Sequence, residues 1–262
     1  MGADVAGARQ SWRARARRRR AERAMARQLA YQREKARAVA GREGEWISAM
    51  AGASARVRGL LEGVRPVGEK ARVLKVGSGA HGLIFFFGGG ECVDVDPLAA
   101  EYASLFPAWQ RRARTVAAYG ESLPFADASF DVVLSDNVVD HAESPPRIVS
   151  ELARVLRPGG LLYFTVNVHH PFDALTSALH AGWNSLGVPF EIGPFADHTV
   201  HLTPAAARQL FAALPLRLVR EETNVEEEKR RARRTRPRHA GDLLKRVFFK
   251  NALYEVVAVR EP

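Results

Sequence analysis

A glycine-rich turn after an apolar stretch is the first place where this sequence could do chemistry. The segment Val73–Gly82, VLKVGSGAHG, carries Gly77, Gly79 and Gly82 at the spacing G-x-G-x-x-G. Glycines at this spacing permit a tight turn and let backbone N–H groups approach a bound nucleotide closely. The segment therefore predicts a nucleotide-type ligand.

An acidic residue follows at the distance that a ribose contact requires. Asp96 lies 19 residues after Gly77, at the end of the next apolar stretch, where its carboxylate could accept hydrogen bonds from ribose hydroxyls. Asp94 is the reserve candidate. These features predict an adenosine-type ligand, but they distinguish NAD from S-adenosylmethionine poorly. A structural glycine turn with a surface aspartate is the alternative.

The elements that must position these residues alternate between apolar strands and helices. Strands are predicted at 71–76, 91–95, 114–118, 130–136, 161–168, 216–223 and 252–259. Helices are predicted at 46–64, 81–87, 97–106 and 145–156, with a further helix capped by Thr203. Uniformly apolar strands flanked by helices indicate an α/β fold, a doubly wound parallel sheet covered on both faces.

Composition divides the chain into an extension and a folded domain. Residues 1–44 are rich in arginine and are expected to be helical or disordered, whereas 45–262 contain the alternating pattern. With 262 residues, 47% of them hydrophobic, the chain can build one sizeable α/β domain.

The single cysteine, Cys92, excludes an intramolecular disulfide and indicates a reducing compartment, so a cytoplasmic location is expected.

The net charge of +10 is concentrated in two clusters, Arg13–Arg20 and Lys229–His239. Such clusters could bind RNA or an anionic membrane surface, because both present phosphates. The alternative is a solvated charge run, which the lack of interleaved aromatic residues favours. The longest apolar run, Leu83–Phe87, is far shorter than the roughly 20 residues that cross a bilayer.

The run Tyr119–Val166 resembles the class I S-adenosylmethionine-dependent methyltransferases. It carries an LPF-x-x-x-x-FD stretch that begins at Leu123 and an E-x-x-R-V-L-x-P-G-G turn that begins at Glu151. The resemblance implies a Rossmann-like sheet of seven strands, mostly parallel, with an antiparallel last strand. It also implies S-adenosylmethionine as the cofactor, because these landmarks have no part in an NAD-dependent oxidoreductase.

The resemblance further implies which residues hold the cofactor, all on loops that follow strands. These are Gly77, Ser78 and Gly79 at its methionine and ribose portion, Asp96 at the ribose hydroxyls, Gly120 and Glu121 beside the adenine, and Asp136 and Asn137 at the transferred methyl. Ligands of open α/β sheets bind outside the carboxyl ends of the strands, which agrees with the last placement.

Three residues depart from the family pattern. Lys75 replaces the acid that helps to hold the ammonium group of the cofactor, His81 stands where a third glycine is common, and Tyr119 replaces an adenine-side acid. Lys75 would repel that ammonium unless it turned away or met a carboxylate. A decayed, non-methylating scaffold protein is therefore an alternative.

The acceptor side offers histidines but no obligatory catalytic residue, since methyl transfer depends mainly on positioning. His141, His169 and His170 follow the fourth and fifth strands and are the candidate substrate contacts. No metal site is predicted. The aromatic segment 171–201 is expected to form a lid, and 226–242 a basic insertion.

The leading hypothesis is a cytoplasmic methyltransferase that acts on a small-molecule or glycan-type acceptor. An RNA acceptor, recruited by the arginine clusters, is the alternative within the same class of enzyme.

Overall fold

The computed structural model describes residues 25–142, 144–171, 200–234, 249 and 251–262. The described strands are β1 (Arg72–Val76), β2 (Glu91–Val95), β3 (Arg114–Val116), β4 (Phe130–Asp136), β5 (Leu156–Val168), β6 (Leu216–Thr223) and β7 (Ala252–Arg260). The described helices are α2 (Glu43–Glu62), η1 (Gly79–His81), α3 (Ile84–Phe87), α4 (Ala99–Leu105), α5 (Pro107–Gln110), η2 (Val139–His141), α6 (Pro145–Val155), α8 (Pro204–Gln209) and α9 (Val225–Arg234).

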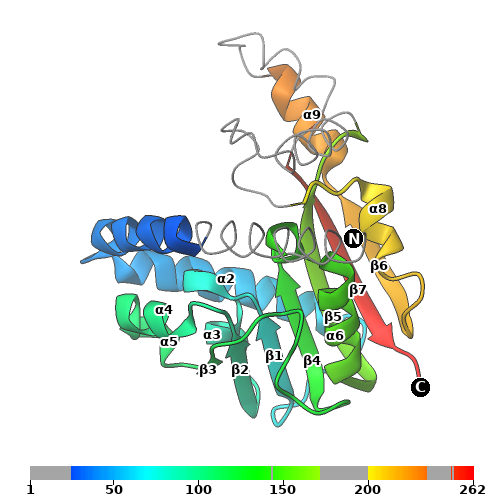
Figure 1. The fold of residues 1–262 in the computed structure, drawn as a ribbon, viewed down its shortest axis with the longest axis horizontal. Coiled ribbons are helices and arrows are strands. Elements are labelled where there is room, and N and C mark those ends of the chain that lie inside the picture. Colours follow the sequence, from blue (N-terminus) through cyan, green and yellow to red (C-terminus); the bar gives the residue numbers. More distant parts are fainter. Residues whose placement is uncertain (1–24, 143, 172–199, 235–248, 250) are drawn as a thin grey trace, which may run out of the picture.

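These strands form one seven-stranded sheet in the order β3-β2-β1-β4-β5-β7-β6 (Figure 1). The pairs from β3 to β5 are parallel, whereas β7 runs antiparallel to both β5 and β6. This arrangement confirms the predicted Rossmann-like fold with an antiparallel last strand. The carboxyl ends of β1, β2 and β4 meet at one rim, where the glycine turn lies.

Two apolar layers cover the sheet on opposite faces (Figure 1). On one face α6 buries Ile148 and Leu152 against the sheet, and on the other α2 buries Val57 and Leu61. Each fully buried side chain of this kind contributes about 1.5–3 kcal/mol to folding. Helices on both faces explain why the strands are apolar on both sides, as the sequence indicates.

Local signals set several boundaries. The Thr203 hydroxyl accepts a hydrogen bond from the Ala206 N–H at 3.1 Å, and Pro204 begins α8, as the sequence predicts. The strand expected at 161–168 begins earlier, at Leu156, and includes the Arg-Pro-Gly-Gly sequence. An irregularity in the pairing of β4 with β5 accommodates this segment, and Gly159 has a φ of +76°.

Part of the predicted N-terminal extension is helical and packs on the domain. Residues 25–39 form a helix in which Gln32 and Val39 are buried. The remaining part, 1–24, lies outside the described residues, and so does most of the expected lid. Of the expected basic insertion, the structure describes α9 and leaves out 235–242. No helix in the described ranges is long and apolar enough to cross a membrane.

Candidate cofactor and substrate site

The glycine turn connects β1 to η1 and needs glycine at two positions. Gly77 and Gly79 have φ angles of +68° and +55°, which L residues with a side chain rarely adopt. A Cβ atom at Gly77 would lie 2.5 Å from Val138 Cγ2, whereas one at Gly79 would meet no atom within 4 Å. The turn is therefore closely packed on the β4 side and open at Gly79, where a ligand can approach the backbone.

Asp96 fixes the glycine turn to the end of β2. Its Oδ2 accepts a hydrogen bond from the Gly79 N–H and its Oδ1 one from the Leu98 N–H, both at 2.9 Å. The side chain is buried, which raises the pKa of the carboxyl, although the two N–H donors oppose this shift. Each carboxylate oxygen retains a further lone pair, so hydroxyl groups of a ligand could bind here as well.

Asp94 lies fully buried beneath the same turn. Neither of its oxygens accepts a hydrogen bond of good geometry, although the Ser78 hydroxyl lies close enough to favour the ionised form. Burial raises the pKa of Asp94 to about 7. Ser78 itself is 8% exposed, and its Oγ lacks a regular partner. Buried polar groups in this condition are frequent at functional sites.

Lys75, the first departure from the family pattern, points into this cluster of carboxylates. It pairs in register with Asp94 across β1 and β2, and its Nζ donates to the carbonyl oxygens of Val76 and Gly77 at 3.1 Å. Burial lowers the pKa of Lys75, while the charges of Asp136, Asp94 and Asp96 oppose that shift. The lysine therefore supports the turn from below and has the carboxylate neighbours that the sequence analysis required.

His81, the second departure, belongs to an aromatic cluster behind the turn. Its ring centroid lies 5.0 Å from Trp46, 4.9 Å from Phe106 and 5.3 Å from Trp109. Burial, together with the charge of Lys35, lowers the pKa of His81 to about 4, so the ring is neutral near pH 7. The position usually occupied by glycine thus attaches the turn to the helical layer.

Two residues of α5 hold the outer side of the turn. The Trp109 indole N–H donates to the Ala80 carbonyl at 2.7 Å, and Gln110 Nε2 donates to the carbonyls of Gly79 and Ala80 at 3.2 Å. These bonds hold the carbonyl groups of the turn against α5. The sequence analysis missed both residues because their contacts are made across about 30 residues of chain.

The predicted adenine side lies after β3. Gly120 is buried, and a Cβ atom there would lie 3.0 Å from Val76 Cγ1, so a larger residue would crowd the first strand. Glu121 follows in the same turn and is half-buried. Tyr119, the third departure, is 54% exposed and donates a hydrogen bond from its hydroxyl to Met25 Sδ at 3.7 Å. An aromatic ring thus stands beside the predicted adenine contacts.

The predicted methyl end lies where β4 stops. Asp136 accepts a short hydrogen bond from the Thr165 hydroxyl of β5. Asn137 has a φ of +51°, a conformation that asparagine tolerates better than most residues, and its N–H donates to the Thr165 carbonyl at 3.1 Å. Unusual backbone conformations of this kind concentrate at ligand sites.

Polar residues continue from there along the acceptor side. Asn167 Nδ2 donates to Asp140 Oδ2 at 3.2 Å, and the rings of His169 and His201 lie 4.5 Å apart. His169 is fully buried and His201 is 8% exposed. Thr165, Asn167 and His169 occupy alternate positions of one strand end, a polar alternation inside an apolar strand that could have indicated Thr165 and Asn167 beforehand.

The other two predicted histidines lie on either side of this group. His170 is half-buried, its N–H donates to the Phe249 carbonyl at 3.0 Å, and its ring lies 5.6 Å from the Phe249 ring. His141 ends η2, and its side chain is not among those described. Within the described ranges, no group of three or more His, Cys, Asp or Glu side chains could hold a metal ion.

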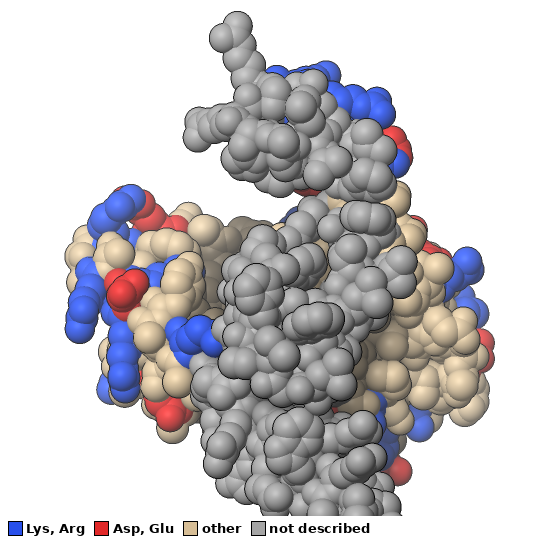
Figure 2. Space-filling model, turned by 45° about the horizontal axis from the view of Figure 1, so that its top comes forward, with Lys and Arg blue, Asp and Glu red and all other residues tan. Residues whose placement is uncertain are grey.

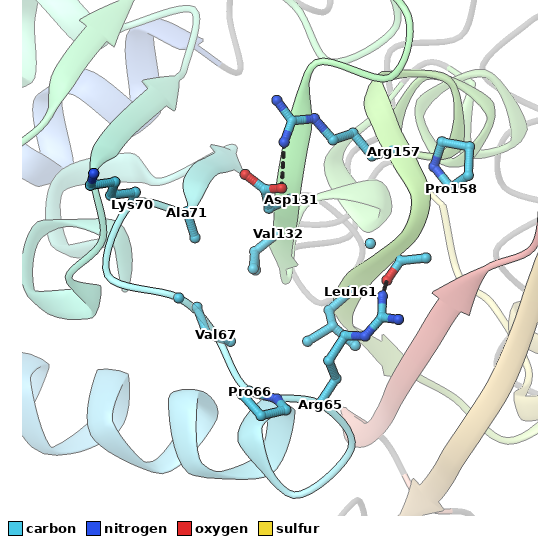
Figure 3. Close-up of a pocket in the computed structure, with 13 residues that line it drawn as sticks. Arg65, Pro66, Val67, Lys70, Ala71, Asp131, Val132, Arg157, Pro158 and Leu161 are labelled. Carbon is cyan, nitrogen blue, oxygen red and sulfur yellow. Dashed lines mark hydrogen bonds and ion pairs between the residues drawn. The ribbon is translucent and has the colours of Figure 1, made fainter.

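A separate cavity of about 340 Å³ lies at the opposite rim, by the amino ends of β1, β4 and β5 (Figure 3). Arg65, Lys70 and Arg157 line it, and Arg157 forms an ion pair with Asp131 at 2.6 Å. Ligands of open α/β sheets bind at the carboxyl ends of strands. The glycine turn, with its buried polar groups, is therefore the better site despite the size of this cavity.

Basic side chains do not form one continuous face in the view of Figure 2, where acidic side chains lie among them. On α9, Lys229 pairs with Glu226 at 2.8 Å and Arg231 lies 3.7 Å from Glu228. The cluster Arg13–Arg20 lies outside the described residues.

Comparisons with known proteins find methyltransferases. A family profile described as a methyltransferase domain matches residues 74–164. An uncharacterised methyltransferase of Mycobacterium sp. (strain JLS) is 38% identical over 133 residues, which are 50% of this chain and 44% of that protein. The thiol S-methyltransferase TMT1B of Rattus norvegicus is 31% identical over 118 residues, 42% of this chain and 48% of that protein. The chain thus spans less than half the length of these relatives.

Solved structures share the fold at low identity. Geranyl diphosphate C-methyltransferase from Streptomyces coelicolor A3(2), with Mg²⁺, geranyl diphosphate and S-adenosyl-L-homocysteine, has a TM-score of 0.56 at 13% identity, covering 80% of this chain and 78% of that one. A geranyl diphosphate methyltransferase in complex with S-adenosylmethionine has a TM-score of 0.55 at 16% identity, covering 80% and 85%.

The sheet order and the glycine turn define a Rossmann-like α/β domain. Residues 74–164 match the methyltransferase-domain family. The chain shares its fold with a methyltransferase solved in complex with S-adenosylmethionine.

Proposed function

We propose that this protein transfers a methyl group from S-adenosylmethionine to a small-molecule acceptor. The observation that carries the proposal is the hydrogen bond between Asp96 Oδ2 and the Gly79 N–H at 2.9 Å. This bond brings the predicted ribose-binding carboxylate directly against the open face of the glycine turn. The profile match over residues 74–164 and the fold neighbour that binds S-adenosylmethionine support the choice of cofactor.

The residues present fit this cofactor. Gly79 is open to a ligand, Ser78 has a buried hydroxyl without a regular partner, and Asp96 has lone pairs to spare. We assign Gly77, Ser78 and Gly79 to its methionine and ribose portion and Asp96 to the ribose hydroxyls. S-adenosylmethionine supplies an electrophilic methyl group on a sulfonium. The protein orients the acceptor and excludes water.

The residues for the adenine and methyl ends of the cofactor are assigned in the same way. We assign Gly120 and Glu121 to the adenine, and Asp136 and Asn137 to the methyl end. Gly120 packs closely on β1, which fixes the backbone of this turn. The bond between Thr165 and Asp136 holds the methyl-end carboxylate in one orientation.

For the acceptor we propose a small molecule that loses a proton on methylation, such as a thiol or an alcohol. TMT1B, a relative over 118 residues, is by name a thiol S-methyltransferase. We assign His169 and its neighbour His201 to receive the proton, because neutral imidazole is the usual base near pH 7. His141 and His170 are proposed as further acceptor contacts. An acceptor screen that measures S-adenosylhomocysteine release from thiols, alcohols and amines tests this assignment.

The test of the cofactor is calorimetric titration with S-adenosylmethionine and, separately, with NAD. We expect micromolar binding of S-adenosylmethionine, which Asp96→Ala weakens by about tenfold or more, about 1.4 kcal/mol. Glu91→Ala is the matched control, because Glu91 lies at the other end of β2 in a half-buried ion pair with Arg72. Its affinity should equal that of the unaltered protein.

Three results would contradict the proposal in different ways. Binding of NAD without S-adenosylmethionine would indicate an oxidoreductase. Equal weakening by Asp96→Ala and Glu91→Ala would remove the assigned role of Asp96. Binding of neither nucleotide would favour the decayed scaffold protein, and Lys75 would then be the first residue to examine.

A further inference from the structure

The helix of residues 25–39 packs by one face on the domain, and the sequence shows this face only weakly. The positions that are buried or half-buried, and lie three or four residues apart, are Met25, Leu29, Gln32, Ala36 and Val39. Gln32 is 6% exposed and Val39 is 2% exposed. Ala36 packs against the apolar cluster on the α2 face of the sheet. A polar residue, Gln32, thus stands at the centre of the buried face.

The later part of this helix lies beside the glycine turn. Lys35 Nζ stands 4.4 Å from the centroid of the Trp46 ring. The Trp46 ring in turn lies 5.0 Å from the ring of His81, which ends η1. Burial, and to a smaller extent the nearby charge of Lys35, lower the pKa of His81. The helix is therefore connected to the turn that we assign to the cofactor.

The earlier part of the helix lies beside the adenosine contacts. The Gln28 side chain lies near the hydroxyl of Tyr102, a buried residue of α4. Burial raises the pKa of Tyr102, and the charge of nearby Asp96 adds to that shift. Met25 Sδ accepts a hydrogen bond from the Tyr119 hydroxyl, next to Gly120 in the chain. The helix thus contacts Tyr102 and Tyr119, which lie near residues that we assign to the ribose and the adenine.

Gln32 lies between these two attachments, one turn after Gln28 and one turn before Ala36. Its Oε1 atom is buried and accepts no hydrogen bond from the described residues. A buried amide oxygen in this condition is unfavourable unless a ligand or water supplies a donor. Adenosine carries such donors in its ribose hydroxyls and its amino group.

We propose that the helix of residues 25–39 forms one wall of the adenosine-binding site, with Gln28 beside the ribose and Gln32 accepting a hydrogen bond from the adenosine. This inference rests on the proposed function. It adds a recognition element from outside the matched residues 74–164, because the family resemblance places cofactor contacts only on loops that follow the strands. Met25 and Tyr119 would close the adenine side.

Gln32→Leu in the full-length protein tests whether the helix of residues 25–39 forms a wall of the adenosine-binding site. The structure predicts opposite effects of this substitution on stability and on binding. Leucine has a similar size and removes the unpaired oxygen, so the thermal unfolding temperature without ligand should stay equal or rise. Affinity for S-adenosylhomocysteine and for adenosine, measured by calorimetry, should fall about tenfold for both. Gln28→Ala should also weaken both ligands.

Arg33→Ala is the matched control, because Arg33 lies on the exposed face of the same helix and should leave both affinities unchanged. One outcome is that the unaltered protein binds both ligands and that Gln32→Leu and Gln28→Ala bind them equally well. That result would overturn the proposed role of the helix in adenosine binding and leave the proposed function standing. If the variants lose affinity for S-adenosylhomocysteine but not for adenosine, the assignment to adenosine is overturned. If the unaltered protein binds neither ligand, the proposed function fails and the wall fails with it.

Discussion

Charged side chains are buried at one rim of the sheet and partly exposed at the other. At the carboxyl rim, Lys75 and Asp94 are fully buried beneath the glycine turn, and Asp94 accepts no hydrogen bond of good geometry. At the amino rim, Arg157 and Asp131 pair at 2.6 Å, with side chains 44% and 34% exposed. The cavity lies at the second rim, whereas the buried and poorly satisfied Asp94 lies at the first.

This difference shows which structural feature is the better guide to the candidate ligand site. Exposed ion pairs lose little hydration on folding, and each contributes about 0–1 kcal/mol to the stability of the fold. A buried charge whose desolvation is not fully offset by a partner lowers the stability of the fold by several times that amount. A fold retains them where binding or catalysis requires them, so burial of imperfectly satisfied polar groups is a better guide here than the volume of a cavity.

The largest expected effect comes from reversing the buried cation. Lys75→Glu would add a fourth carboxylate to the group formed by Asp94, Asp96 and Asp136, and should lower the free energy of unfolding by about 3–5 kcal/mol in urea titrations. Lys70→Glu makes the same change in charge at the exposed amino rim and should stay within about 0.5 kcal/mol of the unaltered protein. Equal effects of the two variants would show that the rims do not differ.

A smaller effect is expected from Asp94→Asn, and it should depend on pH. The pKa of Asp94 is about 7 in the folded protein, against about 3.9 in an unfolded chain. As the pH rises from about 4 to about 7, the unfolded chain releases this proton while the folded protein keeps it. Asp94 therefore lowers the stability of the fold progressively over that range, and the effect is complete above pH 7.

Asparagine does not titrate, so Asp94→Asn should gain stability relative to the unaltered protein as the pH rises. Urea unfolding at pH 5 and at pH 8 measures the difference, and we expect the variant to be relatively more stable at pH 8 by about 1–2 kcal/mol. A difference that is the same at both pH values would mean that Asp94 is already ionised at pH 5.

The smallest effect is expected at the amino rim. Arg157→Ala removes an ion pair that is largely exposed to water, so the free energy of unfolding should fall by less than about 1 kcal/mol. S-adenosylmethionine affinity should not change, because this pair lies at the opposite end of the strands from Asp96. A tenfold loss of affinity would instead assign the cavity of Figure 3 to the ligand.

Much of the fold could be predicted because its signals are local. The strands predicted at 91–95 and 216–223 have the bounds of β2 and β6, and Thr203 with Pro204 marked the start of α8. The start of β5 could not be placed correctly. Proline and two glycines normally break a strand, and only pairing with Phe130 keeps Leu156 in the sheet.

The candidate site was predictable only in part, for a similar reason. Glycine spacing and an acid at the end of a strand identified Gly77, Gly79 and Asp96, because these requirements appear in the chain itself. Trp109, by contrast, donates to a carbonyl 29 residues away, and no local pattern connects the two. Whether the assigned residues hold the cofactor stays a prediction.

The sequence by itself determined the class of fold, the position of the glycine turn and the resemblance that named a cofactor, because strand periodicity and turn chemistry act between neighbouring residues. Only the tertiary structure decided the environment of Lys75. The same lysine would repel the cofactor if it faced the ligand, but it lies under the turn among carboxylates and donates to two carbonyls. Charge and solvation depend on what surrounds a side chain in space, and that is set by the packing of distant segments.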